Sequence, residues 1–581
     1  MEFRGGMRNQ FHVLALVLVT MIVGLPLLFG RVLAGQDIVN YLIHAQQTAE
    51  NFRQGILFPS WSGGYNSGYG SPVLLFFPPV TSLVGALAVL AGIPVIFGVG
   101  SLALVAHLFS GLAIFGWLRS TGFERSALPA AIVYMVAPYR LVDLYLRSAL
   151  GEHWAFIWPP LILWVAGSPK LRPFERVVLT ALAVAGLLLT NVPLAVLFGL
   201  GLAIWFVVST TIRQHRMQVA GGVVLGFSLA FFSLVPLALA STLLDLDACF
   251  GSASGRFRPS SNTLFEAGLS EGNLNVLFSW TVLATFSLAL AAWVLLGRTG
   301  RKSTSARWAM VAVVACLAAT TGPAGPVWDA TPILTNLQFP WRIAAVLTLV
   351  AAALVARLET RRAWVVVGLA AVLAVPFSGW DRTMESGAFH SEKPTHRDPP
   401  GTVFPDSYTA WEAGSGGWYW RHHHLVELCL LPKGMQQFMF GEFTGSPHPI
   451  FDDIRGQAAV FVEDPTTPIR VLEWGQTHRS IEISSPVQGT LMWRVLAFPD
   501  MHVRIDGMES PIAVDRATGL VTHVLPAGSH RVEWRWRPFP ALQWARGVSL
   551  VGLIVSVALS LMAGVRRRRH AGLASKTTEA G

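Results

Sequence analysis

The sequence predicts an all-α polytopic membrane domain of about 12 transmembrane helices, a C-terminal β-sandwich on the outer face, and a final transmembrane helix. Three observations support this fold class. Of the 581 residues, 52% are hydrophobic and only 13% are charged, whereas soluble proteins carry roughly 25% charged residues. Apolar runs recur at about the 20-residue length that crosses a bilayer. Between 380 and 545, short alternating stretches with turn residues replace these runs, as is typical of β-strands.

Basic residues between the apolar runs predict how the chain is threaded. By the positive-inside rule, these short Arg- and Lys-containing loops belong in the cytoplasm. If every run crossed and the amino terminus lay inside, the basic loops would fall outside, so either one run does not cross or the amino terminus lies outside. We expect that one run does not cross and that this run is 72–94, because Pro78 and Pro79 lie near its start. Both termini are then cytoplasmic. The runs are 11–30, 72–94, 97–118, 126–142, 150–167, 176–190, 192–210, 218–240, 274–297, 307–322, 341–357, 363–379 and 547–565.

The chain divides into three parts. Residues 1–379 form the membrane domain with an outer loop at 31–96, 380–545 form the extracytoplasmic β-domain, and 546–581 hold the last membrane helix and a basic cytoplasmic tail. In the β-domain, Val532, Trp534 and Trp536 alternate with charged residues, and Asp506-Gly507 is a strong hairpin signal. The net charge of +10 is spread over short loops, which indicates membrane orientation and excludes nucleic acid as a partner.

The first outer loop begins with polar residues at helical spacing. Asp37, Tyr41 and His44 follow the i, i+4, i+7 pattern, which places them on one face of a helix. A carboxylate there has the chemistry of a general base that takes a proton from an acceptor hydroxyl. We therefore assign Asp37 and His44 to catalysis and Tyr41 to substrate binding. The alternative is that Asp37 merely caps the helix that follows.

A second group of ionisable residues follows the run 126–142. Asp143 and Arg147 are four residues apart, and Glu152 comes after a break at Gly151. Ionisable residues at a membrane face are costly and tend to be functional, so we assign all three to substrate binding. The alternative is a plain salt bridge between Asp143 and Arg147, worth about a few tenths of a kcal/mol.

Arg342 begins another membrane helix, directly after Trp341. A guanidinium group can grip a phosphate with two parallel hydrogen bonds, which predicts that Arg342 binds a phosphorylated substrate. The alternative is that Arg342 only anchors the helix by extending its charged end to the membrane interface.

The sequence indicates no cofactor, and it leaves a divalent metal open without indicating a site for one. The run Arg421–His424 places three histidines in succession, which cannot all face one way. Asp245, Asp247 and Glu266 lack the further ligands that a cation needs. Tryptophans in the β-domain are predicted to form its core, with sugar stacking as the alternative; these are Trp411, Trp418 and Trp420. Cysteine spacing leaves open whether Cys249 and Cys429 pair.

Motifs along nearly the whole chain resemble one family. The chain is similar to bacterial membrane proteins labelled "6-pyruvoyl-tetrahydropterin synthase-related", which are built like glycosyltransferases of the C superfamily. The sequence has nothing like the zinc-histidine site of the soluble synthase, so the label implies no pterin chemistry. The motifs are Asp37–His44, Gly55…Pro59…Trp61, Gly68–Pro72, Phe76–Pro79, Ala137–Arg147 with Glu152, Gln338–Arg342, Phe498–Asp500 and Leu525–His530.

The resemblance implies an integral membrane glycosyltransferase of the bacterial inner (cytoplasmic) membrane. Such an enzyme moves a sugar from a polyprenyl-phosphate donor to an extracytoplasmic glycan or lipid acceptor. Asp37 matches the first-loop acidic residue that serves as catalytic base or orients the acceptor, and Arg342 matches an arginine held against the lipid-linked phosphate. Gln338 belongs to the same motif as Arg342 and is assigned to substrate binding.

A second hypothesis is a non-catalytic membrane protein that binds or presents lipid-linked saccharide during cell-envelope assembly. It needs Arg342 but does not need Asp37 as a base. A purely structural role is a third hypothesis, although an anchor needs far fewer than about 12 crossings.

Overall fold

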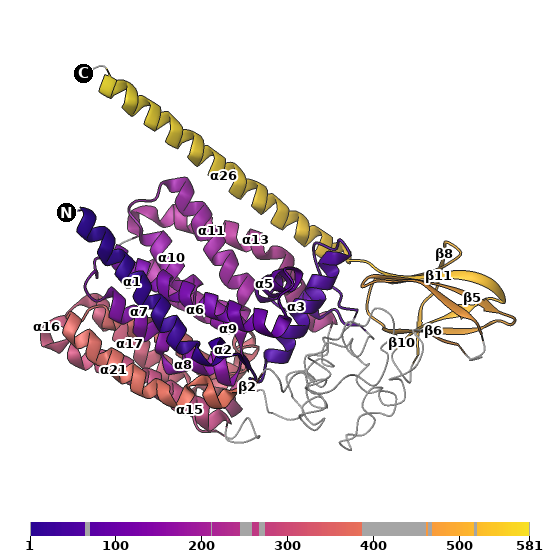
Figure 1. The fold of residues 1–581 in the computed structure, drawn as a ribbon, viewed down its shortest axis with the longest axis horizontal. Coiled ribbons are helices and arrows are strands. Elements are labelled where there is room, and N and C mark those ends of the chain that lie inside the picture. Colours follow the sequence, from indigo (N-terminus) through magenta and orange to yellow (C-terminus); the bar gives the residue numbers. More distant parts are fainter. Residues whose placement is uncertain are drawn as a thin grey trace.

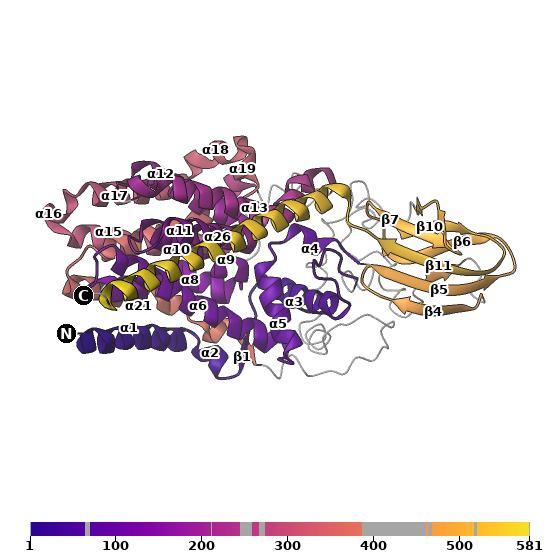
Figure 2. The same ribbon diagram turned by 90° about the horizontal axis from the view of Figure 1, so that it is seen from above.

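The computed structural model describes residues 2–63, 70–210, 212–243, 258–266, 274–385, 460–462, 467–515 and 520–579. These residues form a mostly helical body with a β-domain at one end (Figure 1). The amino and carboxyl termini both lie on the side of the molecule away from the β-domain, as both views show (Figures 1 and 2). The tryptophans 411, 418 and 420, the run Arg421–His424, the pair Asp245 and Asp247, and the cysteines 249 and 429 lie outside the described residues.

Apolar helices make up the body. The first part of the chain contributes α1 (Glu2–Val23), α2 (Leu25–Leu28), α3 (Ile38–Arg53), α4 (Val73–Phe76), α5 (Val80–Leu90), α6 (Val95–Ser120), α7 (Ala127–Val136), α8 (Pro138–Leu141), α9 (Leu150–Ala155) and α10 (Trp158–Gly167). The later part contributes α11 (Pro173–Thr190), α12 (Val192–Val208), α13 (Arg216–Leu243), α15 (Leu274–Leu295), α16 (Gly297–Arg301), α17 (Thr304–Ala319), α18 (Gly325–Ala330), α19 (Pro332–Thr335), α20 (Ala344–Val355), α21 (Thr360–Ala374) and α26 (Pro540–Glu579).

Six helices in the described part of the chain are long and apolar enough to cross a membrane, or eight if two bent pairs each count as one span. The run 72–94 forms the four-residue α4 and the 11-residue α5. At 1.5 Å per residue, α5 is about 16 Å long, roughly half the hydrocarbon thickness. Its length therefore favours the non-crossing role predicted for it. The run 150–167 is divided between α9 and α10, and the number of crossings stays a prediction.

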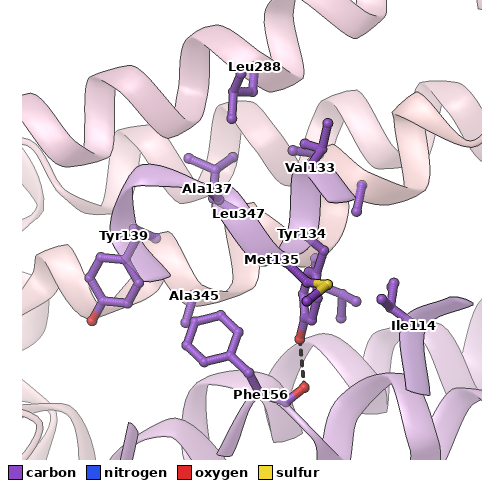
Figure 3. Close-up of a cluster of buried hydrophobic side chains, with 14 of the residues drawn as sticks. Ile114, Val133, Tyr134, Met135, Ala137, Tyr139, Phe156, Leu288, Ala345 and Leu347 are labelled. Carbon is purple, nitrogen blue, oxygen red and sulfur yellow. Dashed lines mark hydrogen bonds between the residues drawn. The ribbon is translucent and has the colours of Figure 1, made fainter. Parts of the chain in front are cut away.

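Small residues allow the helices of the body to pack closely. Ala130, Ala131, Ala345 and Ala352 are fully buried in the largest core cluster. Figure 3 shows part of this cluster, where side chains of α7 and α20 lie against Phe156. The hydroxyl of Tyr134 donates to the Phe156 carbonyl at 2.8 Å. This bond gives the buried hydroxyl a hydrogen-bond partner.

The β-domain is a sandwich of two antiparallel sheets, as predicted. One sheet has the strand order β3-β6-β10-β9 and the other β4-β5-β11-β7-β8. Hydrophobic side chains of both sheets meet in one core cluster. The strands are β3 (Val460–Val462), β4 (Ile469–Trp474), β5 (His478–Ser485), β6 (Gly489–Leu496), β7 (Met501–Ile505), β8 (Met508–Ser510), β9 (Ala513–Val514), β10 (Leu520–Leu525) and β11 (Gly528–Trp536).

Two sequence predictions within the sandwich are confirmed. In β11, Val532, Trp534 and Trp536 are buried while the residues between them are more exposed. Asp506 and Gly507 join β7 to β8, whose ends pair at Ile505 and Met508. Both loop residues have positive φ, 51° and 83°, as a type I′ hairpin turn requires.

The sandwich is attached to the membrane body at two places. Trp61, from the loop between α3 and α4, is fully buried in the sandwich core, with its ring centre 6.0 Å from that of Trp534 and 5.9 Å from that of Trp536. Directly after β11, α26 begins and returns the chain along the body, where Ser549 donates to the Ser228 carbonyl of α13 at 2.9 Å. A small sheet of β1 (Arg31–Leu33) and β2 (Thr383–Glu385) joins the segment before α3 to the end of the helical region.

Candidate functional site

Asp37 occupies the N-cap position of α3, but its side chain does not cap the helix. No hydrogen bond joins its carboxylate to the first turn. Instead, Oδ2 lies 3.7 Å from Nη2 of Arg147, a residue 110 positions further along the chain. The simple capping role that the sequence left open is therefore not what the Asp37 side chain does.

Backbone contacts hold this loop against the segment that carries Arg147. The amide of Asp37 donates to the Arg147 carbonyl at 2.8 Å, and the amide of Gly35 donates to Ser148 Oγ at 3.1 Å. A Cβ atom at position 35 would lie only 2.5 Å from the Ser148 amide nitrogen. Only glycine permits this close approach, and the approach brings Asp37 to Arg147.

A π-helical turn, Val142–Leu146, positions Asp143 and Arg147. The Arg147 amide donates to the Val142 carbonyl at 2.9 Å, the i to i+5 pattern of a π-turn. Arg147 Nη1 lies 2.9 Å from Asp143 Oδ1, and Asp143 is completely buried. The predicted i, i+4 ion pair is present, but it belongs to a larger network.

Glu152, from α9, connects the two arginines. Its Oε2 lies 2.8 Å from Arg147 Nη1 and accepts a hydrogen bond from the Tyr139 hydroxyl at 2.9 Å. Its Oε1 accepts from Arg342 Nε at 2.8 Å. Tyr139, Arg147 and Arg342 therefore meet at one buried carboxylate.

Arg342 is buried rather than extended toward a membrane interface. Its Nη1 donates to the Leu337 carbonyl at 2.6 Å, and its guanidinium lies 4.9 Å from the centre of the Phe339 ring. Trp341, next to it, lies under the guanidinium of Arg147 at 4.8 Å. Gln338 has a positive φ of 64° and forms the bend that precedes this segment. The anchoring role considered for Arg342 does not fit this position.

Tyr41 and His44 take different positions on α3. The Tyr41 hydroxyl accepts a hydrogen bond from the Gly151 amide at 2.8 Å, directly beside Glu152. His44 lies further along the helix, where its ring centre is 4.7 Å from that of Phe77. Burial lowers the pKa of His44 to about 4, so the imidazole is neutral at pH 7. Tyr41 therefore contacts the segment that carries Glu152, whereas His44 packs against Phe77.

Five ionisable residues form the cluster at this site: Asp37, Asp143, Arg147, Glu152 and Arg342. Asp37 is its accessible member. Its side chain is 40% exposed, whereas those of Arg147, Glu152 and Arg342 are 6%, 2% and 10% exposed. Partial burial raises the pKa of the Asp37 carboxyl, and the positive charge of Arg147 opposes this rise. A carboxylate with a raised pKa, held by a buried guanidinium and open to solvent, has the properties of a general base.

Sequence analysis missed two contributors. Tyr139 and Trp341 both lie in motifs that were noted, but neither was assigned to the site. Tyr139 is followed by Arg140 and Trp341 by Arg342, each in an otherwise apolar stretch. A charged neighbour in such a stretch is the sequence signal that could have identified both residues. Within the described residues, no group of three or more His, Cys, Asp or Glu side chains is arranged to hold a metal ion.

The chain matches no model of a known protein family, and no curated protein matches it in sequence. The predicted family resemblance therefore stays a prediction. Among solved structures, the chain is similar to arabinofuranosyltransferase AftD from Mycobacteria, with 14% identity and a TM-score of 0.41 over 63% of this chain. A mutant of AftD gives 15% identity and a TM-score of 0.39, also over 63%. The matched parts cover 26% and 27% of the AftD chains, so this chain corresponds to about a quarter of their length.

Proposed function

We propose that this protein is a membrane glycosyltransferase that moves a sugar from a polyprenyl-phosphate donor to an acceptor hydroxyl. The observation that carries the proposal is the environment of Asp37. This carboxylate is 40% exposed and is held by Arg147, which is itself fixed by two buried carboxylates. Such an arrangement presents one basic oxygen to a substrate while keeping its position fixed.

In the proposed reaction, Asp37 takes the proton of the acceptor hydroxyl. The hydroxyl oxygen forms a bond to the anomeric carbon, and the bond from that carbon to the phosphate oxygen breaks. The bonding electrons leave with the polyprenyl phosphate. A single displacement of this kind inverts the anomeric configuration.

Arg342 is the proposed contact for the donor phosphate. Its Nε and Nη1 atoms bind Glu152 and Leu337, and within the described part of the chain Nη2 has no recorded hydrogen-bond partner. The guanidinium is therefore fixed in orientation with one nitrogen still available to a phosphate oxygen. Arg147 stabilises Asp37 and Glu152 in this scheme, and Tyr41 and Gln338 are further proposed substrate contacts.

The test is transfer by the full-length protein in lipid nanodiscs, with polyprenyl-phosphate pentoses and hexoses as donors and a membrane glycolipid extract as acceptor. Products are identified by mass spectrometry. We expect Asp37→Asn to lower turnover by about 100-fold or more, because loss of a general base typically costs 10²–10⁴. Asp329→Asn is the matched control: this exposed carboxylate accepts hydrogen bonds from Ser260 and lies outside the cluster, so turnover should be unchanged.

The same experiment separates the transferase from the alternative of a protein that only binds or presents lipid-linked saccharide. A binder retains the donor lipid in both variants and forms no product with any donor. Native mass spectrometry of wild type and Arg342→Ala then reports whether a bound polyprenyl phosphate depends on the guanidinium. Equal turnover by wild type and Asp37→Asn would contradict the proposed role of Asp37.

A further inference from the structure

Arg140 lies in the interior of the helical body, next to the candidate site but not in it. The residue is 0% exposed, and no carboxylate in the described residues forms an ion pair with it. Its Nη2 donates to Ser110 Oγ at 3.0 Å and lies 3.1 Å from His107 Nδ1. Its Nε and Nη1 atoms have no hydrogen-bond partner. A buried guanidinium without a counter-ion is costly, so its charge must be balanced by a neighbour at longer range.

The histidines around Arg140 do not alter this charge. A guanidinium can only donate hydrogen bonds, so His107 Nδ1 must accept, and the neutral ring carries its proton on Nε2. His153 stacks on His107 with ring centres 5.4 Å apart and the planes tilted by 8°. Two stacked imidazolium cations would repel each other, and Arg140 would repel both. Arg140 is therefore the cation of this pocket.

Among the described residues, Asp143 is the carboxylate whose charge acts on Arg140. The two residues are three positions apart, on α8 and the π-helical turn that continues it, and their charges interact. Asp143 Oδ1 binds Arg147, but Oδ2 is buried without a hydrogen-bond partner. Both residues thus retain unused polar atoms, and these atoms carry opposite charge.

The charge balance of the whole cluster also supports the pairing of Arg140 with Asp143. Asp37, Asp143 and Glu152 face two guanidiniums, those of Arg147 and Arg342, in the ion-pair network. With all groups ionised, this network has a net charge of −1, which a buried site tolerates poorly. Adding Arg140 makes the number of guanidiniums equal to the number of carboxylates, and cations and anions alternate from Arg140 through Asp143, Arg147 and Glu152 to Arg342.

We propose that Arg140 is the positioning residue that keeps Asp143 ionised, and thereby keeps Arg147 in place to hold Asp37. The described charged and titratable groups that act directly on Asp143 are Tyr139 and Arg140 on α8, Arg147 after the π-turn and Glu152 on α9. Other groups surround these partners: His107 on α6, Tyr134 on α7 and His153 on α9 around Arg140, and Asp37, Tyr41 and Arg342 around Arg147 and Glu152. This assignment concerns the folded cluster and does not depend on the transferase proposal.

Infrared spectroscopy of the full-length protein in nanodiscs tests the assignment through the carbonyl band of protonated carboxylic acids. Arg140→Met removes the positive charge and should produce this band near neutral pH, because one buried carboxyl then takes up a proton. Arg140→Lys keeps the charge and should not produce it. Arg140→Met with Asp143→Asn restores equal charges and should also lack it, since the asparagine oxygen can still accept from Arg147.

Arg176→Met is the matched control. Arg176 is also buried, but its guanidinium donates to the backbone carbonyls of Ala166, Ser168 and Leu171, so its loss should produce no carboxylic acid band. Thermal unfolding gives a second measurement. Asp143→Asn should recover most of the melting-temperature loss caused by Arg140→Met, but none of the loss caused by Arg176→Met.

Two results would overturn the assignment: no carboxylic acid band in Arg140→Met, or additive melting-temperature losses in the Arg140 and Asp143 double variant. If Arg140→Met alone does not fold, recovery of folded protein in the double variant supports the assignment, and failure of the double variant contradicts it. None of these readouts uses turnover, so a failed transferase assay leaves the result interpretable.

Discussion

At the scale of single residues, Glu152 holds the candidate site together. The sequence indicated that Asp143, Arg147 and Glu152 matter, because ionisable side chains near a membrane are costly. It did not indicate that Arg342, 190 positions later, binds the same carboxylate. Contacts between distant segments depend on how helices pack, and residue spacing within one helix carries no information about them.

Glu152→Gln should lower the free energy of unfolding by about 3–5 kcal/mol, because removing one charge of a buried pair leaves its partners uncompensated. Both Arg147 and Arg342 lose their shared counter-ion. Thermal unfolding in detergent measures the effect. Glu359→Gln is the control, since Glu359 is 78% exposed and its 3.8 Å pair with Arg362 should contribute no more than about 1 kcal/mol. Equal losses in the two variants would mean that Glu152 is not a structural counter-ion.

The pH dependence of turnover follows from Asp37. A general base works only when deprotonated, so kcat/KM should fall as pH drops through the pKa of the Asp37 carboxyl. Partial burial raises this pKa above the usual 3.8. The acid limb of the profile should therefore lie above pH 3.8 in wild type. A wild-type profile that stays flat down to that value would contradict the role of Asp37 as the base.

At the scale of secondary-structure elements, local chemistry predicted the β-domain better than the helices. The alternation in β11 and the Asp506-Gly507 turn depend on residues that are adjacent in sequence, and both are confirmed. The break between α9 and α10 was not predicted, although Pro159 and Pro160 lie at the start of α10. Hydropathy averages over a window of about 20 residues and does not register such a break.

The hairpin turn also predicts a pH-dependent contribution to stability. His530 Nδ1 lies 2.7 Å from Asp506 Oδ2, and this contact raises the pKa of His530 and lowers that of Asp506. The raised histidine pKa stabilises the fold below pH 6.5, and this is lost as pH rises through the folded value. The lowered aspartate pKa stabilises it above pH 3.8, and this is lost as pH falls through the folded value.

Asp506→Asn should therefore reduce the melting temperature most between pH 3.8 and 6.5 and progressively less at higher pH. Asparagine tolerates the positive φ of this position, so the turn itself is kept. The effect should not exceed about 1 kcal/mol, because the pair is partly exposed. A melting-temperature difference that is independent of pH would indicate that the turn, and not the ion pair, was changed.

At the scale of the whole molecule, the sandwich and the loop that follows α3 form one unit. Trp61 lies in the sandwich core, and the Gln476 amide of the sandwich donates to Gln54 Oε1 at 2.8 Å, one residue beyond the end of α3. The same helix begins next to Asp37. The sequence predicted a sandwich and an outer loop at 31–96 as separate features, because the contact between them joins residues more than 400 positions apart.

The arrangement of the two ends of the molecule predicts its orientation in the membrane. The sandwich lies at one end, while both termini and the arginine-containing α16 lie at the other (Figure 1). Basic residues concentrate on the cytoplasmic side of membrane proteins, so the end with the termini should face the cytoplasm. The sandwich, the outer loop and Asp37 should then face outward, provided that the run 72–94 does not cross.

Single cysteines test this orientation in a variant whose three native cysteines are replaced by alanine. A membrane-impermeant maleimide applied to intact spheroplasts should label Val487→Cys, since Val487 is 63% exposed on the sandwich. It should not label Ser120→Cys, at the exposed end of α6, until the membrane is permeabilised. Labelling of Ser120→Cys from outside would mean that 72–94 crosses after all. The five-residue cluster would keep its geometry in that case, but the basic loops would lie on the side that the positive-inside rule disfavours.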